Sequence, residues 1–275
     1  MSQGTGGAGL PGRVRELAAS FQDPDVVAAY VHRPPYPAEV FDILESLMAG
    51  GPRRVLDLGA GEGALARPLA ARVDHVDAVE ISPAMVAAGR SRPGGDRPNL
   101  SWHVEAAETM SVRGPYALVT AGASLHWMDW EPTLARAAGL LAPGAFVAIV
   151  DQHHLQLEWR DALREVIVRH SRNPGYDPAF SLPDELSRLG LFEIRGRRET
   201  APTVFRQPMD DYIEHFHSTA SLARALMPPQ EAAEFRAEVE DVVGEHRDAN
   251  GELVLRTAAS IVWGLVVPQQ PAGQP

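Results

Sequence analysis

Residues 55–66, with the sequence VLDLGAGEGALA, constrain the fold more than any other stretch of this chain. They begin as an apolar run typical of a buried strand, break at Gly59, Gly61 and Gly63, and continue with leucines at helical spacing. Glycine has no Cβ, so the backbone can turn sharply there and a ligand can approach it closely. The helix that follows presents free N–H groups. Strand, glycine turn and helix together predict a unit that binds a nucleotide-like ligand.

Two acidic residues flank this turn at informative distances. Asp57 stands two residues before the first glycine, and Glu80 ends a second apolar segment about 21 residues after Gly59. That is close to the spacing at which an acid binds the ribose hydroxyls of a nucleotide. The glycine pattern and the two acids together resemble the cofactor site of the class I S-adenosylmethionine-dependent methyltransferases.

Strand-like and helix-like segments alternate from residue 53 onward, which favours a parallel sheet with helices on both faces. The resemblance adds the Rossmann-like class I methyltransferase fold, an α/β fold with a seven-stranded, mostly parallel sheet and a helical cap. The predicted strands of this part are 53–58, 75–81, 100–104, 116–120 and 144–151, and the predicted helices are 62–72, 83–90 and 131–141.

The pattern changes after residue 151, where longer helical segments and one β-like segment, 192–205, follow. We expect 157–189 and 207–249 to pack together as a cap over the site. The predicted organisation is a disordered start (1–12), a cofactor-binding core with N-terminal lid helices (13–151), a cap that includes the sixth strand (152–249), a last core strand (250–267) and a disordered tail (268–275).

The resemblance continues through a Tyr-x-x-Arg-Pro-x-Tyr-Pro segment at 30–37 and an Ala-Glu pair after the third strand, and it is nearest to small-molecule enzymes of the trans-aconitate methyltransferase group. It implies S-adenosylmethionine as cofactor and S-adenosylhomocysteine as product. The cofactor ammonium is expected near Asp57, the ribose at Glu80 and the cofactor carboxylate at Arg33. The residues that the resemblance implies at the cofactor are Arg33, Tyr36, Asp57, Gly59, Ala60, Gly61, Glu80, Ile81, Ala107, Glu108 and Ala121. Many relatives carry Asp where this chain has Ala106, so the adenine amino group is left to Glu108 or to the backbone.

Histidines at the carboxyl ends of predicted strands are candidates for work on the methyl acceptor, because ligands of open α/β sheets bind there. His126 follows the fourth strand, and His153 and His154 follow the fifth. We predict His126 and His153 as proton acceptors, and Trp127 and His154 as contacts to the acceptor. A carboxylate acceptor would need no base. The expected activity is methyl transfer to O, N or C of a small molecule, with a role in natural-product or secondary metabolism.

Composition narrows the partners of the chain. The formal net charge of −11 argues against nucleic-acid binding, and no apolar stretch reaches the length of a membrane span. The first residues lack the apolar core of a signal peptide, so we expect a cytoplasmic protein, monomeric or homodimeric. There is no cysteine, and neither the adjacent His153 and His154 nor His215 and His217 have the spacing of metal ligands, so no metal is expected.

Two other functions remain open at this stage. The pattern Gly59-x-Gly61-x-x-Ala64 and the acid Glu80 also fit the dinucleotide fingerprint of an NAD(P)-dependent oxidoreductase. A non-catalytic protein that retains the fold is the second alternative. A thermal-shift measurement distinguishes the first alternative from a methyltransferase. S-Adenosylhomocysteine should stabilise a methyltransferase, whereas NADH should stabilise an oxidoreductase.

Overall fold

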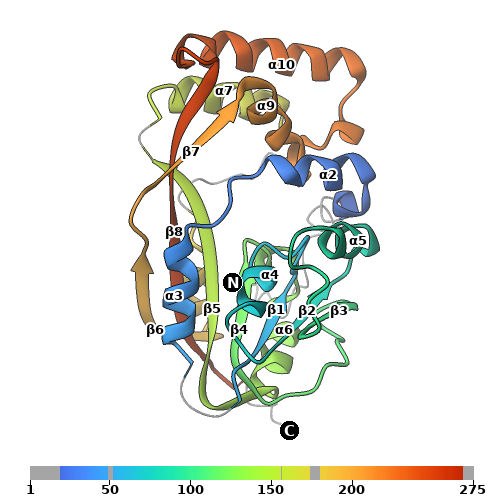
Figure 1. Cartoon of the computed structure of the whole chain (residues 1–275), viewed down its shortest axis with the longest axis vertical. Coiled ribbons are helices and arrows are strands. Elements are labelled where there is room, and N and C mark those ends of the chain that lie inside the picture. Colours follow the sequence, from blue (N-terminus) through green and yellow to red (C-terminus); the bar gives the residue numbers. More distant parts are fainter. Residues whose placement is uncertain (1–18, 49–51, 156, 174–179, 269–275) are drawn as a thin grey trace, which may run out of the picture.

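The computed structural model describes residues 19–48, 52–155, 157–173 and 180–268. The predicted disordered start, and all but the first residue of the predicted tail, lie outside these ranges. Figure 1 shows a lower part built around a sheet and an upper, helical part, joined by long strands and by the N-terminal segment.

The sheet of the described chain has eight strands in the order β3-β2-β1-β4-β5-β8-β6, with β7 paired to β8. Parallel pairs join β1 to β2 and β4, β2 to β3, and β4 to β5, whereas β8 is antiparallel to β5, β6 and β7. Only β8 therefore runs against the rest, and the predicted mostly parallel α/β fold is confirmed. The strands are β1 Arg54–Leu58, β2 His75–Glu80, β3 Leu100–Val104, β4 Tyr116–Gly122, β5 Leu141–Leu155, β6 Phe192–Glu199, β7 Thr203–Pro208 and β8 Glu252–Val266.

Two strands, β5 and β8, are each 15 residues long and connect the two parts of the molecule. They pair from Val147 opposite Gly264 to Leu155 opposite Arg256. On the far side of β8, β6 pairs with residues 260–266 and β7 with residues 252–257. The predicted β-like segment 192–205 is thus two strands, since one strand of ordinary length cannot cover all of β8. The fifth strand was predicted to end at residue 151, but it continues to Leu155, so His153 and His154 lie within it.

The core helices pack against the lower part of the sheet, and the start of α5 follows directly from its sequence. In α5 the Ser82 hydroxyl accepts the N–H of Met85 at 3.3 Å, and Pro83 occupies the first helical position. The helix predicted at 62–72 is shorter, because the chain is still turning until residue 65. These helices are α3 Ala38–Ser46, α4 Ala66–Ala70, α5 Pro83–Ser91, α6 Trp130–Ala138 and α8 Leu182–Arg188.

The cap has a hydrophobic cluster of its own, formed by α7 (Arg160–His170), α9 (Met209–His217), α10 (Pro229–Val243) and the first residues of β8. Phe216 and Phe235 meet edge to face in it, with ring centroids 5.9 Å apart. The prediction that all of 157–189 belongs to the cap is wrong for α8. Leu182 and Leu186 of that helix are buried against Phe192 in the lower cluster, because they form an apolar stripe on one face.

The N-terminal segment ties the cap to the core. After α2 (Pro24–Ala29) and a 3-10 turn at Tyr30–His32, the Arg33 side chain donates to the Ser218 hydroxyl at 2.7 Å and to the Ser218 carbonyl at 2.8 Å. The Gln207 amide donates to the carbonyl of His32 at 2.6 Å. We call residues 30–37 the strap. In the part of the chain that the structure describes, no helix is both long and apolar enough to span a bilayer.

Candidate active site

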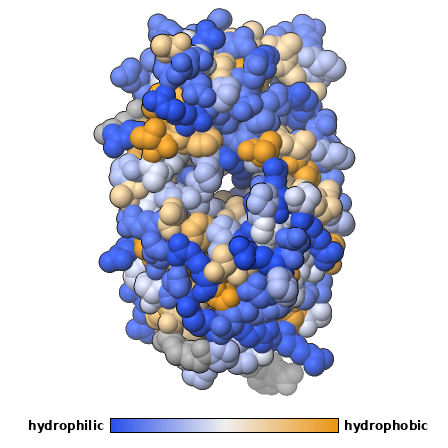
Figure 2. Space-filling model, in the orientation of Figure 1, coloured by the Kyte–Doolittle hydropathy of each residue, from blue (hydrophilic) through white to orange (hydrophobic). Residues whose placement is uncertain are grey.

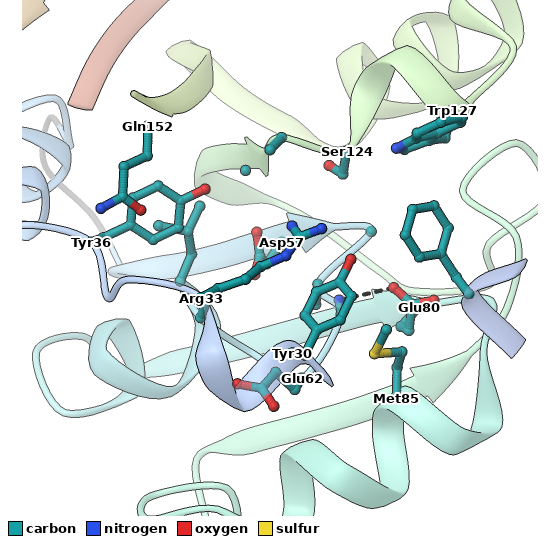
Figure 3. A pocket seen from close by; sticks show the side chains of 18 of the residues that line it. Tyr30, Arg33, Tyr36, Asp57, Glu62, Glu80, Met85, Ser124, Trp127 and Gln152 are labelled. Atoms are coloured by element: carbon teal, nitrogen blue, oxygen red, sulfur yellow. Dashed lines mark hydrogen bonds between the residues drawn. The ribbon is translucent and has the colours of Figure 1, made fainter. Parts of the chain in front are cut away.

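A cavity of about 1140 Å³ lies between the carboxyl ends of the core strands and the cap. Figure 2 shows the surface hollowed between the two parts, and Figure 3 shows the side chains inside. Its walls come from the glycine turn after β1, the ends of β2 and β5, the strap, and α9 of the cap. This is the edge of the sheet at which open α/β proteins bind their ligands.

The glycines of the turn have two different roles. Gly59 has φ +62°, and a Cβ on it would lie 2.7 Å from both Met128 Cε and Ser124 Cβ, so it is needed for packing within the protein. Gly61 has φ +56°, but the nearest heavy atom to its Cβ would be Tyr30 Cε1, at 3.8 Å. Both conformations favour glycine, and Gly61 in addition leaves open space at the cavity wall.

Glu80, the last residue of β2, is buried at the cavity wall and points toward the glycine turn (Figure 3). Its Oε2 accepts the N–H of Gly61 and its Oε1 accepts the N–H of Ser82, each at 2.8 Å. Burial raises the pKa of this carboxyl, and the two backbone hydrogen bonds oppose the rise. Each oxygen keeps a lone pair for a ligand hydroxyl. The next residue, Ile81, is 56% exposed and lines the cavity, so it offers an apolar surface.

Asp57 is a buried carboxyl with one oxygen still unpaired. Its Oδ1 accepts the hydroxyl of Thr120 at 2.8 Å, while Oδ2 has no hydrogen-bond partner among the described residues. Burial raises its pKa to about 7, and the hydroxyl of Thr120 and the nearby backbone N–H of Ala66 oppose the rise. Asp57 lines the cavity, and a carboxylate there fits a cationic donor such as an ammonium group, held directly or through water. With Glu80 and the open backbone at Gly61, it matches the cofactor that the sequence predicts.

The two predicted strap residues also line the cavity. Tyr36 is close to the end of β4, since a Cβ on Gly122 would lie 3.0 Å from its hydroxyl oxygen. Arg33 stacks on Tyr30, with its guanidinium carbon 4.1 Å from the ring centroid. Its hydrogen bonds to Ser218 mean that this guanidinium also holds the cap, which the sequence did not predict.

Two residues predicted at the adenine lie at the cavity wall, whereas Ala121, predicted elsewhere at the cofactor, does not. Ala107 and Glu108 line the cavity, as does Ala60 of the glycine turn. The Oε1 of Glu108 accepts the N–H of Asp129 at 2.9 Å, so one oxygen holds the start of α6 rather than a ligand. Ala121 was predicted to contact the cofactor, but it faces the buried core, because side chains alternate along β4.

His126, predicted as a proton acceptor, does not line the described cavity. It lies in the 3-10 turn Leu125–Trp127, which buries Leu125 and turns Trp127 to the cavity wall. The His126 ring packs on Trp127 with centroids 4.7 Å apart, and burial lowers its pKa to about 4. Trp127 meets Phe21 edge to face at 5.3 Å. Trp127, predicted to contact the acceptor, thus lines the cavity, whereas His126, predicted as a proton acceptor, does not.

The histidines of β5 differ from one another. His153 lines the cavity, but its Nε2 lies 3.2 Å from Glu199 Oε1 on β6, at an exposed position. His154 also lines the cavity, and its Nδ1 is enclosed without a hydrogen-bond partner among the described residues. Burial lowers the pKa of His154 to about 4.

The cap and the upper strands bring further residues to the cavity that the sequence did not indicate. His215 of α9 has its ring centroid 6.1 Å from that of His154, and Phe205 of β7 and Thr257 of β8 lie in the same wall. The sequence analysis considered His215 only together with His217, as a possible pair of metal ligands. No local pattern could place it, because it meets His154 only through the packing of the cap on the extended strands.

Comparison with known proteins agrees with the geometry at the glycine turn. Residues 55–144 match a family described as a methyltransferase domain. A trans-aconitate 2-methyltransferase of Mycobacterium sp. (strain KMS) is 34% identical over 137 residues, which is 49% of this chain and 52% of that protein. A malonyl-[acyl-carrier protein] O-methyltransferase of Ilyobacter polytropus is 32% identical over 92 residues, 32% of this chain and 34% of that protein. The chain thus spans about half the length, or less, of these curated relatives.

Among solved structures, a protein assigned as a type II methyltransferase from Anaeromyxobacter dehalogenans superposes with a TM-score of 0.57. The superposition covers 86% of this chain and 99% of that one at 20% sequence identity, so it bears on the fold alone.

The nicotinamide alternative is disfavoured on two grounds. A dinucleotide-binding sheet has the order 3-2-1-4-5-6, whereas here the antiparallel β8 is inserted between β5 and β6. The family match over residues 55–144 is to methyltransferases. This match and the relatives support a methyltransferase domain of the class I S-adenosylmethionine-dependent type over residues 55–144.

Proposed function

We propose that this chain transfers a methyl group from S-adenosylmethionine to a small molecule held between the core sheet and the cap. The observation that carries the proposal is one continuous cavity of about 1140 Å³ that reaches from the glycine turn to α9. Sites for a single small ligand usually measure about 300–1,000 Å³. The space therefore suits a cofactor and an acceptor together.

The residues of the turn would hold the cofactor, whose sulfonium supplies an already activated methyl group. Asp57 offers its carboxylate to the ammonium, directly or through water, and Glu80 offers one lone pair on each oxygen to the ribose hydroxyls. Gly61 lets the backbone come close, and Ile81 offers its exposed side chain to the adenine face.

The rest of the chain would align the acceptor and keep water away. The strap, fixed by the bonds of Arg33 to Ser218, crosses the cavity and favours an acceptor that fits beneath the cap. Relatives named for trans-aconitate and for a malonyl carrier protein support a small acceptor group. A place in secondary metabolism, a cytoplasmic location, a monomer or homodimer, and no nucleic-acid partner stay predictions.

Two measurements test the proposal. Calorimetry should show binding of S-adenosylhomocysteine and none of NADH. The protein is then incubated with methyl-labelled S-adenosylmethionine and a panel of small hydroxyl, amine and carboxylate compounds, and the labelled products are identified. Failure to bind S-adenosylhomocysteine would overturn the assignment of the site. Binding without transfer to any compound of the panel or of a cell extract would favour the non-catalytic alternative.

A further inference from the structure

Two histidines at the cap end of the cavity are not used by the cofactor, and they carry an inference that rests on the proposed function. His154 lies on β5 and His215 on α9, and their rings meet at an angle of 63° with centroids 6.1 Å apart. Both line the cavity, and both lie outside the residues 55–144 that match the family. They therefore belong to the part of the site that this chain's own cap completes.

The tautomer of His215 is fixed by its surroundings. Its Nδ1 lies 2.7 Å from the carbonyl oxygen of Tyr212, and a carbonyl can only accept, so Nδ1 carries the proton. Burial lowers the pKa of His215 to about 3, the bond to Tyr212 opposes this, and His154, Arg33 and His32 facing the ring lower it further. The ring is therefore neutral, and its Nε2 holds a lone pair.

The tautomer of His154 follows from the surroundings of its Nδ1 atom. Its Nδ1 is shielded from solvent and has no partner among the described residues. A proton there would be a buried donor without an acceptor, which folded proteins avoid more strictly than an unfilled lone pair. Burial, with the charges of His153 and Arg160, lowers its pKa to about 4 and keeps the ring neutral. The single ring proton therefore belongs on Nε2, which is not among the enclosed unpaired atoms.

We propose that His154 and His215 form a subsite for a hydroxyl group, whose oxygen accepts the Nε2–H of His154 and donates its own proton to Nε2 of His215. A carboxylate has no proton to give to His215, and an ammonium group has no lone pair for His154. The acidic residues that line the described cavity come from the glycine turn and the ends of β1, β2 and β3, so an ammonium finds no counter-charge at the cap end. They are Asp57, Glu62, Glu80, Glu105 and Glu108.

The same arrangement handles the proton of the reaction. As the bond between the acceptor oxygen and the methyl carbon forms, the bond between that carbon and the cofactor sulfur breaks, and sulfur keeps the electron pair. The hydroxyl proton passes to Nε2 of His215 and from there to solvent. Oxygen that is gaining a methyl group is a much stronger acid than an imidazolium ion, so an imidazole of low pKa can take this proton. Because neither ring takes up a proton near neutrality, kcat at saturating cofactor should be flat between about pH 6 and 8.

The test uses phenol, benzoate and benzylamine, three probes of similar size, each incubated with S-adenosylmethionine and the full chain. S-Adenosylhomocysteine formation is measured. We expect it with phenol and not with the other two. His215→Gln keeps an acceptor near the position of Nε2 but is not a base, so KM for phenol should change by less than about threefold while kcat falls at least about 100-fold. His154→Phe removes the donor and should raise KM.

The matched control is His246→Gln, because His246 packs on Trp159 of the cap and does not line the cavity. His246→Gln should leave both kcat and KM for phenol unchanged. Calorimetry with S-adenosylhomocysteine should give the same affinity for all variants within about twofold, which separates failure of this subsite from failure of the proposed function.

A second readout does not depend on turnover. Nitrogen NMR of the protein with S-adenosylhomocysteine should show His215 protonated at Nδ1 and His154 at Nε2, both neutral at pH 6. Added phenol should shift the His215 Nε2 signal, and benzoate should not. Preference for benzoate, full kcat in His215→Gln, or the opposite tautomers would each overturn the proposal.

Discussion

The two ends of the cavity are built in different ways. At the cofactor end, Asp57, Gly59, Gly61 and Glu80 lie within one short stretch of chain, and backbone N–H groups hold the Glu80 carboxylate. At the cap end, His154, His215 and Thr257 come from three elements far apart in the sequence. A backbone turn fixes one ligand chemistry, whereas side chains from separate elements can be exchanged one at a time. The difference explains why a family can share a cofactor and differ in acceptors.

The ends also differ in charge. Acidic side chains gather at the cofactor end, and burial raises the pKa of both Asp57 and Glu80. Neutral histidines gather at the cap end, where burial lowers the pKa of His154 and His215. The first set suits a cationic ligand with hydroxyl groups, and the second an uncharged polar group. The predictions that follow test this contrast.

Glu80→Ala should have the largest effect at the cofactor end. It removes both proposed ribose contacts and leaves the N–H groups of Gly61 and Ser82 without their acceptor, so affinity for S-adenosylhomocysteine should fall by about 2–3 kcal/mol, roughly 30- to 150-fold. Calorimetry measures this, with Glu193→Ala on the exposed face of β6 as the control. Unchanged affinity would remove Glu80 from the site.

Substituting valine for Gly59 and for Gly61 should show which glycine is needed for packing and which for contact with the ligand. Both positions have positive φ, so each substitution strains the backbone by about 1–2 kcal/mol. Gly59→Val also drives carbon into Met128 and Ser124, which should cost about 1–3 kcal/mol more in urea unfolding. Gly61→Val should stay better folded and yet lose cofactor binding. Normal binding by Gly61→Val would mean that the open backbone there serves no ligand.

Asp57 should make cofactor binding depend on pH. Its pKa is raised to about 7 by burial, and a bound ammonium would stabilise the ionised form, so binding releases a proton near neutrality. Affinity for S-adenosylhomocysteine should therefore weaken as pH falls below about 7, by up to about tenfold per pH unit. Titrations at pH 6 and 8 check this. Asp57→Asn should bind more weakly, and a slope that persists in this variant would assign the proton to another group.

The smallest expected effect lies in a buried charge network that the cavity does not use. Asp77 of β2 accepts from His103 Nε2 and from the Tyr116 hydroxyl, each at 2.8 Å. Burial alone would raise the pKa of Asp77, but these hydrogen bonds outweigh it and hold that pKa well below its usual range. The hydrogen bond to Asp77 raises the pKa of His103.

Because the pKa of Asp77 is lowered and that of His103 is raised, the two groups change the free energy of unfolding in opposite directions as pH rises. The stabilisation from Asp77 is present above its unfolded pKa of about 3.9 and is lost as pH falls below it, while that from His103 is present below about 6.5 and is lost as pH rises through the raised folded value. The contribution of Asp77 and His103 to the free energy of unfolding should thus be highest between about pH 5 and 6 and fall on each side by on the order of 1 kcal/mol. Asp77→Asn should flatten both slopes in urea titrations. Its affinity for S-adenosylhomocysteine should not change, and a change would extend the cofactor end to this network.

Much of the core could be predicted from the sequence because its signals are local. Buried parallel strands are short apolar runs, the turn requires glycine where φ is positive, and Glu80 follows at a fixed spacing. Two predictions for residues of the core were wrong, and in both cases the reason was also local. The side-chain alternation of β4 turned Ala121 into the core, and a single 3-10 turn moved His126 off the cavity wall.

The cap end was decided by tertiary structure. His215 reaches the cavity beside His154 because α9 packs against β7 and β8, and because β5 and β8 run 15 residues each and extend beyond the core sheet. A helical period shows which face of α9 is apolar, but not which strand it meets. The sequence by itself determined a domain that binds S-adenosylmethionine, since that site is made by neighbours along the chain. The proposed acceptor site joins residues separated by up to about a hundred positions, and only the packing of cap on core places them together.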